Sequence, residues 1–263
     1  MSKHSLFIET PISVILQDAS KVFDCISWGM ESFALAEYLL NSIFIKMTGA
    51  QEQKFKCLVW EIGAEDYRFR YEHIYGKWEY GECSALEAKT KILASLYEST
   101  HNLCKQKSFA NDLKDYKEGQ FTNVKQQIVD FYNKTLKRSV NQRDFEDFCR
   151  LWDKKFIYLD GFANIVENEK ENKFVIATSV DQLKKDEKAK VERMILFSDM
   201  YNHLFRFRNI CAHNLKSYQQ DYYNLYELRE KSSVTDNYFF RFATLMIMDA
   251  IAIKLYKNFQ SVV

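Results

Sequence analysis

Residues 242–256, Phe242-Ala-Thr-Leu-Met-Ile-Met-Asp-Ala-Ile-Ala-Ile-Lys-Leu-Tyr256, form the most apolar stretch in the later part of the chain. Two charged residues, Asp249 and Lys254, interrupt it. The stretch is too short and too charged to cross a bilayer, which takes about 20 predominantly apolar residues. We therefore predict a helix buried in the core of the protein, from about residue 237 to residue 259.

The composition agrees with a fold made of helices. The chain has 263 residues but only 7 glycines and 1 proline, and both residue types break helices and form turns. A many-stranded fold needs such turns every few residues. Because 47% of the residues are hydrophobic, a large core can form. We predict a mainly α protein, a helical bundle with one or two small β or irregular insertions.

The spacing of apolar residues places the other helices. After an irregular lead over residues 1–19, Ser20 is predicted to begin a first helix, and Gly49 is predicted to end a second one that starts at Glu31. Ser84 and Glu87 match a capping box at the start of the next helix. Further helices are expected over residues 84–107, 121–138, 142–153 and 183–212.

Two segments differ from this helical pattern. Residues 67–75 alternate aromatic and charged side chains, which is typical of a strand and predicts a small hairpin or an extended loop. Residues 156–180 contain two apolar runs around a polar one, which predicts a second hairpin or a surface excursion. We divide the chain into an N-terminal helical region with a small hairpin, 1–83, and a helical bundle, 84–263.

Charge and cysteine content limit the classes of function. The formal net charge is only +1, whereas proteins that hold long duplex nucleic acid carry a basic excess, so any contact with nucleic acid is expected to be local. The six cysteines are scattered, without metal-ligand or disulfide spacing, which favours buried, reduced thiols in a cytoplasmic protein. No signal peptide is visible at the N-terminus, so a cytoplasmic location is expected.

One stretch indicates a chemistry: Arg208-Asn209-Ile210-Cys211-Ala212-His213, followed by Asn214. It combines a permanent cation, an amide and an imidazole that titrates near neutral pH. A cation can neutralise a phosphate and an imidazole can move a proton, so the set suits work on a phosphodiester. A second pair with similar spacing, Arg68 and His73, is less promising because an aromatic residue follows that arginine in a strand-like stretch.

The pattern Arg208-Asn209-x-x-Ala212-His213 resembles the R-x4-6-H signature of the HEPN superfamily, in which the residue after the arginine is usually polar. Members are α-helical bundles, and many are metal-independent endoribonucleases of toxin–antitoxin, abortive-infection or CRISPR systems. The resemblance implies a HEPN-type bundle, an RNA substrate and a role in antiviral defence or in a toxin–antitoxin pair. It also implies that no cofactor or metal is needed and that an antitoxin or other regulatory protein is a partner.

The resemblance also implies a role for each residue. Arg208 would bind the scissile phosphate, His213 would act as general acid or base, and Asn209 would orient the phosphate or the imidazole. The 2′-hydroxyl of the RNA would be the nucleophile, leaving a 2′,3′-cyclic phosphate and a 5′-hydroxyl without a metal. His203, Arg206 and Asn214 are the candidate substrate-binding residues beside these three.

Helical geometry complicates the arrangement. At 100° per residue, Asn209 and His213 share one face of the helix, whereas Arg208 lies on the opposite, apolar face. Arg208 and His213 of one straight helix therefore do not meet by themselves. Either the helix ends before His213, or the long arginine wraps around it, or Arg208 of one subunit meets His213 of another. Because the family site usually lies between two motifs, a homodimer is the natural inference.

Alternatives without catalysis stay open. Arg208 can be a buried arginine paired with a core carboxylate such as Asp249 or Asp199, and His213 can be a histidine favoured by the dipole at a helix C-terminus. The protein would then be a non-catalytic helical module that binds a partner or a nucleotide. A third alternative is a toxin-like subunit that is masked by an antitoxin or by its own N-terminal region.

Overall fold

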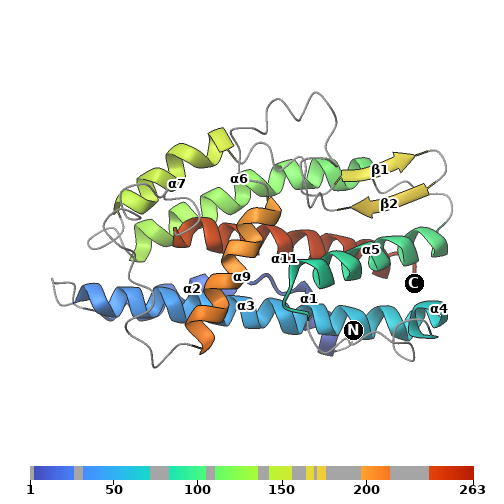
Figure 1. Ribbon diagram of the computed structural model, residues 1–263, viewed down its shortest axis with the longest axis horizontal. Coiled ribbons are helices and arrows are strands. Elements are labelled where there is room, and N and C mark those ends of the chain that lie inside the picture. The colour runs from blue at the N-terminus through green and yellow to red at the C-terminus, as the bar shows by residue number, and fades with distance from the viewer. Residues whose placement is uncertain are drawn as a thin grey trace.

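The computed structural model describes residues 3–26, 32–71, 83–104, 110–135, 142–155, 164–168, 171–175, 197–213 and 237–263. Within these ranges the protein is mainly helical, as the composition predicts (Figure 1). The long helix α3 (Ser32–Glu65) runs alongside α11 (Tyr238–Gln260), and α9 (Phe197–His213) crosses both on one side. Three more helices pack against α11: α5 (Leu86–Leu103), α6 (Ala110–Thr135) and α7 (Gln142–Lys155).

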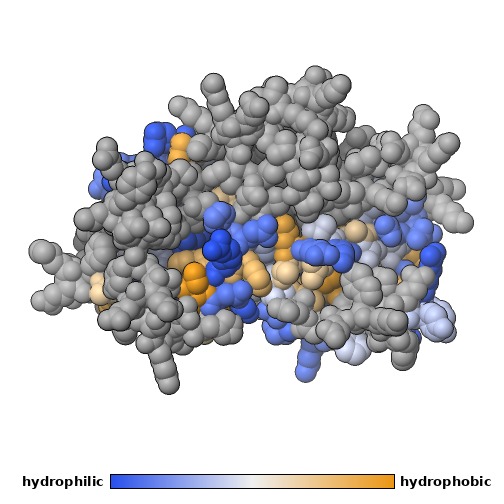
Figure 2. Space-filling view, viewed as in Figure 1, coloured by the Kyte–Doolittle hydropathy of each residue, from blue (hydrophilic) through white to orange (hydrophobic). Residues whose placement is uncertain are grey.

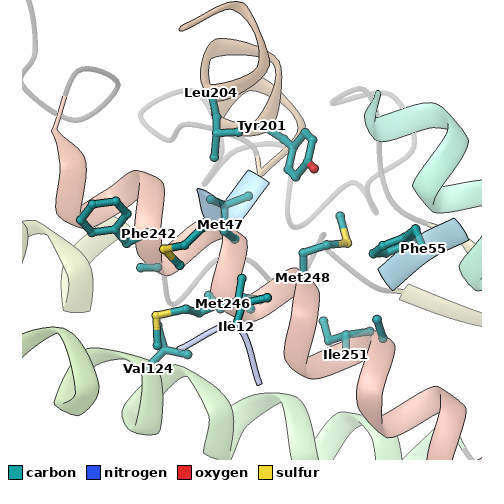
Figure 3. Close-up of a cluster of buried hydrophobic side chains, with 14 of the residues drawn as sticks. Ile12, Met47, Phe55, Val124, Tyr201, Leu204, Phe242, Met246, Met248 and Ile251 are labelled. Carbon is teal, nitrogen blue, oxygen red and sulfur yellow. The ribbon is translucent and has the colours of Figure 1, made fainter. Parts of the chain in front are cut away.

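The central helix is α11, which contacts α1 (Lys3–Glu9), α3, α5, α6, α7 and α9. Among its residues only Ala250, Lys254, Lys257 and Gln260 are not buried. A helix that is apolar on all sides must lie inside a core, so the prediction of a buried helix over residues 237–259 is confirmed. Figure 3 shows Phe242, Met246, Met248 and Ile251 of this helix within the core, beside residues of α3, α6 and α9. None of the helices in the described ranges has the length and apolar content needed to cross a membrane.

Of the two charged residues inside the apolar stretch, Lys254 is only partly buried, whereas Asp249 lies in the core. Asp249 is buried and pairs with the buried Lys54 of α3 at 2.5 Å between Oδ1 and Nζ. Its other oxygen accepts a hydrogen bond from the Ile12 backbone N–H, and Lys54 also donates to the Thr10 carbonyl oxygen. Burial raises the pKa of Asp249 and lowers the pKa of Lys54, because the interior disfavours either charge alone. This pair ties α3, α11 and the N-terminal segment together.

The N-terminal prediction is wrong. Two helices, α1 (Lys3–Glu9) and α2 (Val14–Asp24), occupy the segment that was expected to be irregular. Ile8, Ile12 and Leu16 recur at four-residue spacing and are buried in the core, which stabilises helical structure around Pro11. Ser20 lies inside α2 rather than before it, and its hydroxyl donates to the carbonyl oxygen of Leu16.

Gly49 does not end a helix, because α3 continues through it from Ser32 to Glu65. Glycine costs only about 1 kcal/mol within a helix relative to alanine. Burial of Met47 and Phe55 on either side, each of which is 0% exposed, outweighs that cost. The second helix is therefore longer than the sequence predicts.

The strand expected over residues 67–75 is also wrong for residues 67–71, and residues 72–75 lie outside the described ranges. A short helix, α4 (Tyr67–Phe69), follows α3 directly, and the Asp66 side chain caps it by accepting from the Phe69 N–H at 3.0 Å. The Arg70 guanidinium donates to the carbonyl oxygens of Gly63 and Ala64 at the end of α3. Arg70, one of the alternating charges, thus serves a helix end rather than a strand.

Smaller differences concern the ends of other elements. Ala85 is the N-cap of α5 and makes no side-chain cap bond, so the capping box at Ser84 is wrong. Helix α6 begins at Ala110, earlier than expected. The strands β1 (Asn164–Asn168) and β2 (Glu171–Val175) pair antiparallel, with Asn164 opposite Val175, so the hairpin predicted within residues 156–180 is confirmed over these two strands.

Side chains from both sides of residue 83 share one cluster. It includes Ile8 and Phe44 from the first predicted region, and Leu93, Phe131 and Phe242 from the second. The described helices therefore pack across the predicted boundary, and the division into 1–83 and 84–263 stays a prediction.

Candidate functional site: the Arg208 cluster

The motif lies at the C-terminal end of α9, and the helix continues through His213. A helix break before His213 is therefore excluded, and the five positions from Arg208 to His213 separate them by about 140° around the helix axis. The predicted faces of α9 are confirmed where side chains are described. Met200 and Leu204 are buried, whereas His203 is exposed.

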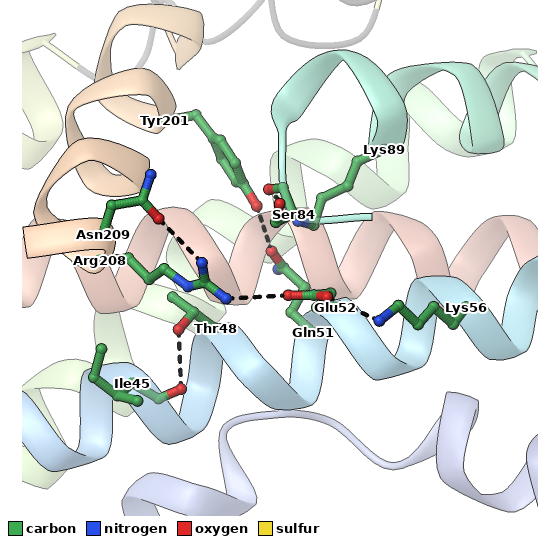
Figure 4. Close-up of polar contacts among 10 residues, drawn as sticks. All are labelled: Ile45, Thr48, Gln51, Glu52, Lys56, Ser84, Lys89, Tyr201, Arg208 and Asn209. Atoms are coloured by element: carbon green, nitrogen blue, oxygen red, sulfur yellow. Dashed lines mark hydrogen bonds and ion pairs between the residues drawn. The ribbon is translucent and has the colours of Figure 1, made fainter. Parts of the chain in front are cut away.

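Arg208 faces α3 from α9 and lies in a polar cluster (Figure 4). Its Nη2 lies 3.3 Å from Oε2 of Glu52, and its Nη1 donates to Oδ1 of Asn209 at 3.0 Å. Both the arginine and the glutamate are partly buried, with side chains 26% and 16% exposed. The expectation of a carboxylate partner for this arginine is confirmed, but Asp249, one of the two suggested carboxylates, is wrong because it pairs with Lys54. The side chain of Asp199 lies outside the described residues.

Glu52 is shared between two cations. Its Oε1 lies 2.9 Å from Nζ of Lys56, one turn later on α3, while its Oε2 faces Arg208 of α9. Figure 4 shows Glu52 between the two, with its carboxylate pointing toward the end of the arginine. One carboxylate thus balances cations from two helices.

A third cation, Lys89 of α5, lies at the same place. It is only 2% exposed, and its Nζ donates to the carbonyl oxygen of Ser84 at 2.7 Å. The ammonium lies 5.3 Å from the centre of the Tyr201 ring and 5.6 Å from that of Phe55, distances at which a cation is attracted by an aromatic face. A backbone carbonyl oxygen and two aromatic rings therefore stabilise this buried lysine, and the contacts described for its amine include no carboxylate.

Burial lowers the pKa of Lys89 to about 7. The negative charge of Glu52 opposes this shift, and the positive charge of Arg208 adds to it. A lysine amine that titrates near neutral pH can be neutral or charged under physiological conditions. Nearby, burial also raises the pKa of the Cys83 thiol, while the charges of Lys89 and Lys56 act in the opposite direction.

Tyr201 closes the cluster on its inner side. Its hydroxyl donates to Oε1 of Gln51 at 2.7 Å, and the Gln51 side chain donates in turn to the carbonyl oxygen of Leu245 on α11. This chain of bonds fixes α9 to α3 and to the central helix. The space left between Glu52, Lys89, Tyr201 and Arg208 is a cavity of about 10 Å³, which is enough for about one water molecule.

The other predicted site residues lie elsewhere or outside the described residues. His203 and Arg206 are exposed on the outer face of α9. Figure 2 shows hydrophilic residues in the middle of the face that α9 crosses. The side chain of His213 and all of Asn214 lie outside the described residues. Of the predicted residues, the structure therefore brings together Arg208 and Asn209.

Sequence reasoning did not find Glu52, Lys56, Lys89 or Tyr201 as neighbours of the motif. One signal was present for Lys89, which lies three residues after Leu86 and four before Leu93, both buried. A lysine at an apolar position of an amphipathic helix indicates a buried charge. Glu52 gives no comparable signal, because its partner Arg208 is 156 positions away in the sequence.

No group of three histidine, cysteine, aspartate or glutamate side chains in the described ranges is close enough to hold a metal ion. None of the six cysteines forms a disulfide. Comparisons with protein-family models, with curated proteins and with solved structures gave no match. The resemblance to the HEPN superfamily therefore depends on the motif and on the helical fold alone.

Proposed function

We propose that the protein is a metal-independent endoribonuclease of the HEPN type that cleaves RNA through attack of its 2′-hydroxyl. In this proposal Arg208 binds the scissile phosphate and His213 acts as general acid or base. Asn209 positions the guanidinium, since its side-chain oxygen accepts a hydrogen bond from Nη1 of Arg208. The observation that carries the proposal is that Arg208, with its guanidinium bonded to Asn209, lies on the same helix as His213.

The reaction needs only proton transfer and charge stabilisation. A base removes the proton of the 2′-hydroxyl, the 2′-oxygen bonds to phosphorus, and the bond to the 5′-oxygen breaks as an acid protonates that oxygen. The products are a 2′,3′-cyclic phosphate and a 5′-hydroxyl. Arg208 would stabilise the charge on the non-bridging oxygens, since a guanidinium matches two phosphate oxygens at once. The exposed Arg206 and His203, together with Asn214, would contact flanking parts of the RNA.

The active form in this proposal is a homodimer. Arg208 and His213 are about 140° apart around a continuous helix, and Arg208 is directed at α3. A second copy of α9 would supply the histidine that one chain does not bring to its own arginine. The protein would act in the cytoplasm, in defence or in a toxin–antitoxin pair, with an antitoxin or other regulatory protein as its partner.

A second candidate function is supported by a specific observation, the ion pair between Arg208 and Glu52. A partly buried arginine paired with a carboxylate can simply join two helices. The protein would then be a non-catalytic helical module that binds a partner or a nucleotide. In that case purified protein leaves RNA intact, and Arg208→Ala mainly lowers the melting temperature.

The test is cleavage of a labelled single-stranded RNA by the purified chain in EDTA. We expect cleavage that yields a 2′,3′-cyclic phosphate and that stops when the nucleotide at the cut has no 2′-hydroxyl. His213→Ala and Arg208→Ala should each lose most of the activity. Lys91→Ala, which changes an exposed lysine of α5 outside the cluster, is the control and should cut as wild type does.

Equal cleavage by wild type and His213→Ala would overturn the assignment of His213. Intact RNA with a correctly folded wild-type protein would favour the second candidate. Growth inhibition on expression, relieved by His213→Ala, would separate a masked toxin from a non-catalytic module.

A further inference from the structure

The Arg208 cluster contains three cationic side chains and one carboxylate. Arg208 and Lys56 each contact one oxygen of Glu52, and Lys89 lines the same small cavity. With Lys89 protonated the cluster carries a net charge of +2, and with Lys89 neutral it carries +1. Such an excess of positive charge, partly removed from water, favours a further negative charge.

The cations come from three separate helices and converge on one point. Arg208 belongs to α9, Lys56 to α3 and Lys89 to α5. The side chain of Asn209 holds one end of the guanidinium, and the Ser84 carbonyl oxygen holds the ammonium of Lys89. Arg208 and Lys89 are therefore held by bonds that do not involve Glu52, whereas Lys56 donates to Glu52 itself.

We propose that Arg208, Lys56 and Lys89 form a phosphate-binding site and that Glu52 occupies it in the free protein as an internal competitor. The proposal rests on the assignment of Arg208 to phosphate under Proposed function, and it adds two cations and a competing carboxylate to that assignment. The ligand class is a phosphate group, either of a nucleic acid backbone or free in solution.

A carboxylate is a suitable stand-in for a phosphate. Both present two oxygens to the fork of a guanidinium, and both accept charge-assisted hydrogen bonds from lysine. The cavity of about 10 Å³ has no room for a phosphate while Glu52 points inward. The glutamate can leave by rotation about its side-chain bonds, and the side chain of Lys56, which is 31% exposed, can turn from Glu52 to the incoming phosphate. Binding then requires no movement of the helices.

Lys89 would strengthen binding once the phosphate is present. Burial holds the pKa of its amine at about 7, so protonation near neutral pH depends on nearby charge. An arriving phosphate favours the ammonium form, as Glu52 already does. The lysine would therefore take up a proton together with the anion.

The test uses Glu52→Gln in the full chain, which keeps the shape of the side chain but removes its charge. Calorimetric titration with inorganic phosphate, and separately with a short 2′-deoxy oligonucleotide that cannot be cleaved, distinguishes the two sources of phosphate. We expect Glu52→Gln to bind at least one of these about tenfold more tightly than wild type, equivalent to about 1.4 kcal/mol. Glu87→Gln, which neutralises an exposed glutamate paired with Lys91, is the matched control and should bind as wild type does.

Two double variants show which cations are responsible for the gain in phosphate affinity. Glu52→Gln with Arg208→Ala should lose it entirely, and Glu52→Gln with Lys89→Met should lose a large part of it. If Glu52→Gln folds poorly, as judged by circular dichroism, Glu52→Asp takes its place, because the shorter carboxylate retracts from Arg208 and should give a smaller gain. Unchanged binding in a folded Glu52 variant, or a gain that persists without Arg208, overturns the proposal.

The binding measurement is independent of cleavage. Tighter phosphate binding by Glu52→Gln together with intact RNA would support this site and contradict the endoribonuclease. RNA cleavage without any gain on removal of the Glu52 charge would support the endoribonuclease and contradict the competitor.

Discussion

Two ion pairs join α3 to a later helix, and they differ in how far solvent can reach them. In the pair of Lys54 with Asp249 the side chains are 1% and 2% exposed, and backbone groups of Thr10 and Ile12 complete their hydrogen bonds. In the pair of Arg208 with Glu52 the side chains are 26% and 16% exposed, and the separation is longer, 3.3 Å against 2.5 Å.

The difference separates a structural contact from one that can be exchanged. Removing one member of a buried pair leaves a charge that neither water nor another group can reach, which costs about 3–5 kcal/mol. A pair at the surface contributes about 0–1 kcal/mol, because water replaces the lost partner. The pair of Arg208 with Glu52 lies between these limits, so its members can separate when a competing anion offers similar bonds.

Asp249→Ala should give the largest effect. It leaves the Lys54 charge and the Ile12 N–H without their partner inside the core, and we expect a loss of about 3–5 kcal/mol in the free energy of unfolding. Urea denaturation followed by circular dichroism measures this loss. Asp18→Ala, which breaks an exposed aspartate–lysine pair in α2, should change the midpoint little. Similar midpoints for the two variants would remove the distinction between the pairs.

Lys89→Met should change how stability depends on pH. The unfolded lysine has a pKa of 10.5 and the folded one about 7, so above pH 7 the unfolded state binds more protons and the stability of wild type rises with pH. The rise is at most about 1.4 kcal/mol per pH unit, or about 2 kcal/mol from pH 7 to 8.5, and it is absent below pH 7.

Urea denaturation of wild type and Lys89→Met at pH 6, 7, 8 and 8.5 checks this. As the pH rises above 7, the free energy of unfolding of wild type should increase relative to that of Lys89→Met. Lys91→Met, an exposed lysine two positions later, should give a difference that does not change with pH. Parallel curves for Lys89→Met would mean that the buried amine keeps an ordinary pKa.

Apart from the control variants, Arg208→Ala should give the smallest change in the free energy of unfolding. We expect a loss of about 1–2 kcal/mol, between the values for exposed and buried pairs. Arg206→Ala, on the exposed face of the same helix, should stay within about 0.5 kcal/mol of wild type. Thermal unfolding of wild type, Arg208→Ala and Arg206→Ala at one pH measures these differences. A loss for Arg208→Ala as large as that for Asp249→Ala would make the arginine a structural residue and favour the non-catalytic candidate.

Much of the fold follows from local patterns. The apolar run around Asp249 predicts α11 closely, and three- to four-residue spacing predicts the described faces of α9. The errors arise where distant contacts outweigh local preference. Gly49 lies within α3 because the core holds both sides of it, and Arg70 caps the end of α3 although its neighbours alternate like a strand.

The sequence predicts only part of the candidate site. Arg208 and Asn209 were found because they are adjacent in one motif, and adjacency is visible in a single sequence. Glu52 and Lys89 approach Arg208 only when α3, α5 and α9 pack together. A single sequence has no record of that packing, and the charge of Lys89 at an apolar helix position indicated burial but not its neighbours.

The central place of α11 has a consequence for how the chain is made. This helix lies between residues 238 and 260, yet it packs against α1 and holds the N-terminal segment through Asp249. Contacts between such distant segments slow folding, because a long loop must close before they form. A nascent chain that has emerged only as far as α9 lacks the central helix against which both α3 and α9 pack. We therefore expect the site to form late in synthesis, after most of the chain has left the ribosome.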